Sequence, residues 1–157
     1  KMADCITRYM SDKGQLDKIV FGSDTPTGQG ANPNCIQRMA MRMAAFNNIP
    51  PEQAIAMGTG NTADLFGLNR GKIEVGREAD ILAIDVGQNT VGQDALEAMK
   101  NDDTFGVAMV MVDGQVVSLK GRDGRPTRRF IRIDGDTYKI DNINEYLFGP
   151  YFPGYLH

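Results

Sequence analysis

The sequence predicts an α/β protein in which a buried strand and several helices precede a β-rich unit. Three observations carry this prediction. Residues 16–21 form an apolar run with little alternation, which is typical of a strand buried on both faces. Apolar side chains then recur at helical spacing up to Phe66. From Gly71 onward the period changes to that of strands, and Asp113-Gly114 is a strong hairpin signal.

The first half of the chain is expected to alternate one strand with helices. A helix over residues 3–13 stops at Gly14, and a parallel strand follows over Lys18–Ser23. Asn32 and Pro33 are good first residues for the next helix. Its predicted inner face is Ile36, Met39, Ala40 and Met43. Further helices are expected to begin near Pro51 and to be capped by Thr59, the last one ending at Phe66-Gly67.

The second half is expected to consist mainly of strands. Residues 72–75 alternate and residues 80–85 form a strand bounded by acids, with a turn between them. A short helix is expected within residues 92–100. Hairpins are predicted over residues 107–119 and around Asp134-Gly135.

Composition excludes several classes of protein. No apolar stretch reaches the roughly 18 residues that suggest a membrane span, and the net charge of -3 argues against a general nucleic-acid binder. We therefore expect neither a membrane nor a nucleic acid as partner. Cys5 and Cys35 are too few for a disulfide framework, and we expect both to be small buried side chains in a reducing, cytoplasmic compartment.

The C-terminal region from residue 121 has an unusual charge and composition. Its basic residues are Arg122, Arg125, Arg128, Arg129, Arg132 and Lys139. A basic tail of this kind can touch an acidic partner or RNA, although a solvated or subunit-contacting tail is the simpler interpretation. Residues 146–155 are aromatic with Pro and Gly breaks, and we expect them to pack on a neighbouring surface. A homo-oligomer is therefore expected.

Asp24 is the strongest candidate for a functional residue. It follows the apolar run directly and precedes a Gly-rich loop, so a buried strand would deliver its carboxylate to the strand's C-terminal end, where barrel enzymes place catalytic groups. The alternative is an Asx turn that only caps the loop. The only histidine is His157, and no second acid lies on a neighbouring strand end.

Three motifs resemble the C-terminal part of the amidohydrolase superfamily. They are Thr59-Gly-Asn-Thr-Ala63, Gly71-Lys-Ile-Glu-Val-Gly-Arg-Glu-Ala-Asp80 and Phe21-Gly-Ser-Asp24. The resemblance covers roughly residues 3–119. It implies the C-terminal portion of a (β/α)₈ barrel plus a small β-sandwich. Residues 1–68 would then hold the last strand and helices of the barrel, residues 69–120 the sandwich portion, and residues 121–157 a basic and then aromatic tail.

The resemblance also implies a chemistry. The family uses a mono- or dinuclear site of zinc and/or iron, and Asp24 matches its last metal ligand. Metal-bound water reaches a pKa near 7, and a carboxylate beside it can take up its proton and later give it to the leaving nitrogen. The other ligands would lie upstream of Lys1. Thr25 and Thr27 could donate hydrogen bonds to a substrate, with plain loop filler as the alternative.

Within the superfamily, the order of elements after Asp24 is most similar to that of a hydrolase of a cyclic enamide. The sequence therefore predicts the C-terminal portion of a metal-dependent hydrolase of a cyclic amide or related C–N bond, inactive as an isolated segment. Two other classes remain: a non-catalytic β-sandwich module for assembly or binding, and a small enzyme that pairs Asp24 with another carboxylate, as in glycoside hydrolysis.

Overall fold

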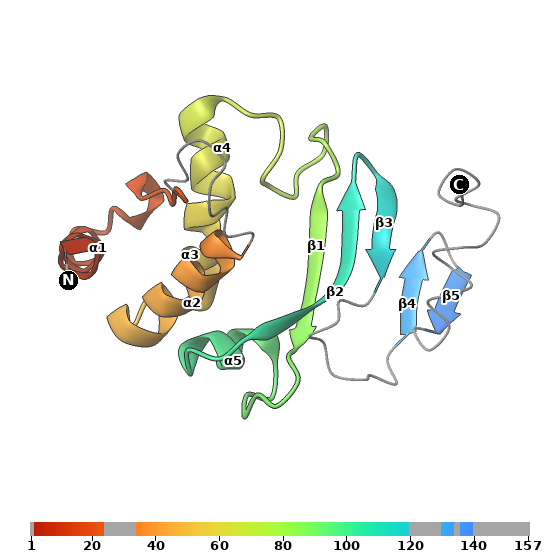
Figure 1. The fold of residues 1–157 in the computed structure, drawn as a ribbon. Helices are drawn as coiled ribbons and strands as arrows, with labels where there is room; N and C mark the ends of the chain where they lie inside the picture. The colour runs from red at the N-terminus through yellow and green to blue at the C-terminus, as the bar shows by residue number, and fades with distance from the viewer. Residues whose placement is uncertain (1, 24–33, 120–129, 134–135, 140–157) are drawn as a thin grey trace.

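The computed structural model describes residues 2–23, 34–119, 130–133 and 136–139. Helices α1 to α4 gather on one side, the sheet β1–β2–β3 lies on the other, and α5 lies close to both (Figure 1). The elements are α1 (Met2–Asp12), the 3₁₀ helix η1 (Leu16–Lys18), α2 (Cys35–Asn47), α3 (Pro51–Gly58), α4 (Gly60–Phe66), β1 (Ile81–Val86), α5 (Ala95–Lys100), β2 (Phe105–Val112), β3 (Gln115–Leu119), β4 (Phe130–Ile133) and β5 (Asp136–Lys139). None of the helices described is both long and apolar enough to cross a bilayer.

The main apolar core joins α2, α3, α5 and the start of β2. Its members are Ala40, Met41, Met43, Ala44, Ile49, Ala54, Met57, Ala95, Met99 and Phe105. The largest side chains that are completely buried are Met43, Met57 and Met99, followed by Pro51. Methionine suits this junction because its flexible side chain fills irregular gaps between elements.

Helix α2 differs in detail from its prediction. Ala40 and Met43 are buried as predicted, but Ile36 and Met39 are only half-buried. The buried residues of α2 run from Ala40 to Asn47, in the C-terminal part of the helix, where Met43 and Asn47 also accept hydrogen bonds from Thr7 and Arg8 of α1. Asn34 occupies the cap position, while the predicted cap Asn32-Pro33 lies outside the described residues.

The strands form two antiparallel groups. One sheet has the order β1–β2–β3, with Ile81 opposite Met111 and Met109 opposite Leu119. Asp113 and Gly114 both have positive φ, +50° and +74°, which is the signature of a type I′ hairpin turn, and the predicted hairpin is confirmed. Strands β4 and β5 form the second predicted hairpin. A small antiparallel sheet is thus present, but a two-layer β-sandwich is not confirmed.

Two of the predicted strands, over residues 18–23 and 72–75, do not form in the structure. Residues 16–18 form η1, and residues 19–23 continue without strand pairing, with Ile19, Val20 and Phe21 half-buried. Residues 72–75 are likewise unpaired, and Ile73 is 87% exposed. Both segments have the apolar pattern of a strand, but a strand also needs a neighbour to complete its hydrogen bonds. No neighbouring strand pairs with either segment within the described ranges.

The expected burial of the cysteines is also wrong. Cys5 is exposed and Cys35 is only partly buried. Helix α1 contacts α2 and η1 along one side, where Thr7 is its buried residue. Cys5 is not part of that buried side, and Cys35 is the first residue of α2, whose buried residues begin at Ala40.

Replacing Gly114 by Ala is expected to lower the free energy of unfolding by about 1–2 kcal/mol, because a Cβ is disfavoured at positive φ even though open space surrounds it. Thermal melting of the intact protein measures the change. Gly22→Ala is the matched control, since Gly22 also has open space around it but no positive φ. Equal melting temperatures for the two variants would contradict the turn assignment.

Candidate functional site

The segment of residues 16–23 leads directly to Asp24, the residue on which the proposed chemistry depends. Asp24, Thr25 and Thr27 themselves lie outside the described residues, so their side chains are not placed. The described residues instead show how the chain is held just before Asp24. That support comes from α3 and α4.

Asn61, near the start of α4, is the main polar contact of this segment. Its side-chain Nδ2 donates to the carbonyl oxygens of Leu16 and Ile19, each at 2.9 Å. Further along, the backbone N–H of Phe21 donates to the carbonyl oxygen of Met57 in α3 at 3.2 Å. The sequence analysis placed Asn61 in a family motif and did not predict this role.

Apolar packing adds to these hydrogen bonds. Leu16, Ile19 and Phe21 are partly buried against the core. A Cβ on Gly58 would lie 2.5 Å from Ile36 Cγ2, so the end of α3 approaches the Ile36 side chain of α2 too closely for any other residue without a shift. The same Cβ would make an ordinary contact with Phe21 Cδ2, at 3.6 Å, so Phe21 lies directly beside the end of α3.

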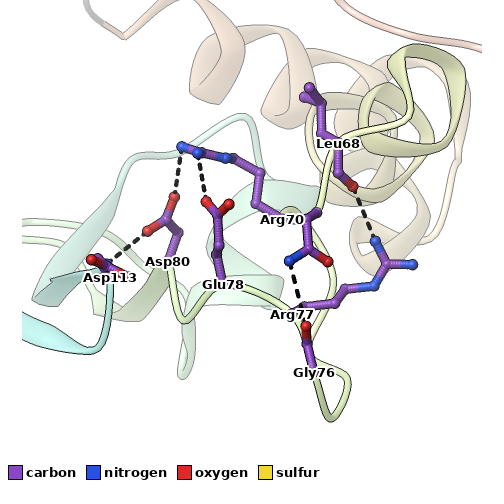
Figure 2. Close-up of polar contacts among 8 residues, drawn as sticks. Leu68, Arg70, Gly76, Arg77, Glu78, Asp80 and Asp113 are labelled. Carbon is purple, nitrogen blue, oxygen red and sulfur yellow. Dashed lines mark hydrogen bonds and ion pairs between the residues drawn. The ribbon is translucent and has the colours of Figure 1, made fainter.

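The motif over residues 71–80, together with Arg70, forms a connection between α4 and the sheet that several polar contacts hold in place (Figure 2). Arg70 contacts both Glu78, at 2.5 Å, and Asp80, at 3.1 Å. Asp80 Oδ1 accepts a hydrogen bond from the backbone N–H of Asp113 at 2.9 Å. The motif thus ties the turn between β2 and β3 to the chain that enters β1, and Asp80 serves there as a hydrogen-bond acceptor and ion-pair partner.

The helical end of the same connection is held in a similar way. Arg77 Nη1 donates to the carbonyl oxygen of Leu68 at 3.1 Å, and Arg77 Nε pairs with Glu74 at 2.6 Å (Figure 2 shows the Leu68 contact). Lys72 pairs with Asp64 of α4 at 2.6 Å. These ion pairs and the hydrogen bond hold the loop against α4.

The described residues do not by themselves form a metal site. Among them, no group of three or more His, Cys, Asp or Glu side chains is close enough to hold a metal ion. A pocket of about 620 Å³ lies beside Asn61, Leu16, Asp17 and Gln53. It is next to the beginning of the segment, at Leu16 and Asp17.

Asp80→Ala is expected to lower the free energy of unfolding by about 1–2 kcal/mol, because it removes an acceptor of the Asp113 N–H and one partner of Arg70. Urea unfolding of the intact protein measures the loss. Glu74→Ala removes only an exposed pair with Arg77 and should cost no more than about 0.5 kcal/mol. If both variants lost the same free energy of unfolding, Asp80 would stabilise the protein no more than an exposed ion-pair residue does.

Comparison with known proteins agrees with the motifs. Residues 6–117 match the family described as "Amidohydrolase family". The chain is 38% identical over 133 residues to the enamidase of Eubacterium barkeri, an alignment that covers 85% of this chain and 34% of that protein.

A solved structure is similar as well. The crystal structure of enamidase, described as a member of the amidohydrolase superfamily, superposes with a TM-score of 0.75 at 38% identity and covers 82% of this chain. The chain spans about a third of the length of these relatives, 34% and 33% in the two comparisons. The resemblance in the motifs is therefore confirmed, and the portion of the fold that precedes the sheet is that of a barrel family. The chain belongs to the amidohydrolase family.

Proposed function

We propose that this chain is the C-terminal portion of a metal-dependent hydrolase that opens a C–N bond in a cyclic amide or a related compound. Family membership and the similarity to enamidase support a hydrolase. The observation that carries the proposal is the support of residues 16–23. Two hydrogen bonds donated by Asn61 and one accepted by the carbonyl oxygen of Met57 hold a segment whose next residue is Asp24.

Asp24 has a defined chemical task in this proposal. Its carboxylate accepts a proton from the attacking water and returns it to the leaving nitrogen. The proposal includes zinc and/or iron in a mono- or dinuclear site. The described side chains contain no cluster that could hold such a metal ion. The further ligands would come from outside this chain. Thr25 and Thr27 would border the substrate and offer it hydroxyl groups.

A β-sandwich that includes residues 69–120 is a second part of the proposal. Apolar residues lie on both faces of the sheet: Leu82 pairs with Val110, and the next pair, Ile81 with Met111, points to the opposite face. Leu82 is nonetheless 52% exposed. Antiparallel sheets usually leave only a polar face open to water, so both faces of this sheet suit contact with further protein.

A non-catalytic module for assembly or binding is the competing proposal. The exposure of Ile73, Val75 and Leu82 favours it, because large apolar side chains gathered on a connection and a sheet are typical of contact surfaces. The same surfaces also suit the remainder of a hydrolase or a second copy in a homo-oligomer. Turnover by the intact protein separates the two classes.

In the intact protein, Asp24→Asn is expected to lower kcat by at least about 100-fold, because an amide of the same size cannot accept the proton. Steady-state kinetics with a cyclic amide measures the loss, and thermal melting checks that folding is kept. Asp17→Asn is the matched control, since Asp17 is exposed on η1 a few residues earlier. Wild-type turnover in the Asp24 variant would refute the proton-transfer role.

Removal of metal is expected to abolish hydrolysis. Dialysis of the intact protein against a chelator should remove zinc or iron, as elemental analysis would show, and the activity should return when either metal is added back. Dialysis without the chelator is the control. Full turnover in metal-free protein would eliminate the metal-dependent proposal while leaving the family assignment in place.

A further inference from the structure

We infer that Asn61 is a positioning residue for the reaction: it holds the backbone before Asp24 without touching the substrate. The inference rests on the proposed function, because it concerns how Asp24 is brought to its place. It is drawn from the contacts of one side chain. Those contacts distinguish it from an ordinary helix residue.

The amide nitrogen of Asn61 is engaged by the segment through both of its N–H groups. Its Nδ2 carries two N–H groups, and both carbonyls that it contacts lie at 2.9 Å. The carbonyls belong to Leu16, the first residue of η1, and Ile19, the residue directly after it. The opposite orientation of the amide would place its oxygen against two carbonyl oxygens, so only one orientation is favourable. One side chain therefore fixes both ends of η1 on α4.

Asn61 does not serve its own helix. It is the second residue of α4, after Gly60, and the cap position is occupied by Thr59. Thr59 makes no side-chain cap and instead donates to the carbonyl oxygen of Ile55 at 3.0 Å. Asparagine ranks low among helix formers in general. The local structure thus provides no reason for an asparagine at residue 61, whereas the segment does.

The segment depends on this contact because strands do not hold it. Residues 19–23 have no strand pairing in the part of the chain that is described. Beyond Ile19, the N–H of Phe21 bonds to Met57 at 3.2 Å, and Ser23, the residue before Asp24, is exposed. A shift of η1 would therefore act on the few residues between Ile19 and Asp24, in which the Phe21–Met57 bond is the one further backbone hydrogen bond that the described residues show. A misplacement of about 1 Å at a reacting group can lower a rate about 100-fold.

The test uses Asn61→Leu in the intact protein, since leucine has a similar size but no donors. We expect kcat to fall about 10- to 100-fold with KM within about threefold of wild type. Hydrogen exchange of residues 16–23 should become faster. Thr59→Val is the matched control, because it removes a neighbouring hydrogen bond that stays within the helices. It should leave kcat within about twofold and the exchange unchanged.

Asn61→Gln covers the case in which the leucine variant does not fold. It keeps both donors but moves them by one methylene, so we expect kcat between those of wild type and of a donor-free variant, again with little change in KM. A kcat equal to that of Thr59→Val, a change in KM alone, or unchanged exchange of residues 16–23 overturns the inference. Failure of the proposed function is seen separately, as wild-type turnover in Asp24→Asn. If that variant is inactive while Asn61→Leu is fully active, the positioning role alone is refuted.

Discussion

The burial of Met43, Met57 and Met99 in one apolar cluster is the constraint on which the other contacts of the molecule depend. It brings α2, α3 and α5 together and joins them to the start of β2. Met57 also extends this constraint toward Asp24, because its carbonyl oxygen accepts the N–H of Phe21. Loss of a fully buried Met typically costs about 2–5 kcal/mol, so the segment before Asp24 rests on a well-stabilised support.

Sequence reasoning succeeded where a few consecutive residues decide the structure. Pro51 begins α3, Gly67 ends α4 and Asp113-Gly114 closes a hairpin, because each acts through its own backbone preference. It failed for residues 16–21 and 72–75. Both have the composition of strands, but strand formation depends on a partner elsewhere, and a local pattern carries no information about that partner.

The candidate site was predictable to a different extent. Asp24 stands out in the sequence by its position after an apolar run, and its role stays a prediction because it lies outside the described residues. Asn61 could have been found by a weaker signal: an asparagine in the first turn of a short helix that does not cap it. Such a residue is locally unfavourable, and an unfavourable residue often has a partner at a distance. Only the coordinates identify Leu16 and Ile19 as those partners.

The Ala-Asp pair that ends the family motif has a physical explanation in the hairpin that it contacts. In a two-residue turn, the N–H groups of both turn residues point away from the ladder, which pairs Val112 with Gln115. Here the carbonyl oxygen of Ala79 accepts from Gly114 at 3.1 Å, and Asp80 accepts from Asp113 at 2.9 Å. Both unpaired donors of the turn are thereby satisfied. Asp80 meets Arg70 with its other oxygen, so one carboxylate joins the hairpin to the connection from α4. The motif therefore connects the sheet to α4, one of the two helices that hold the segment before Asp24. These contacts account for the acid at residue 80 without a catalytic role.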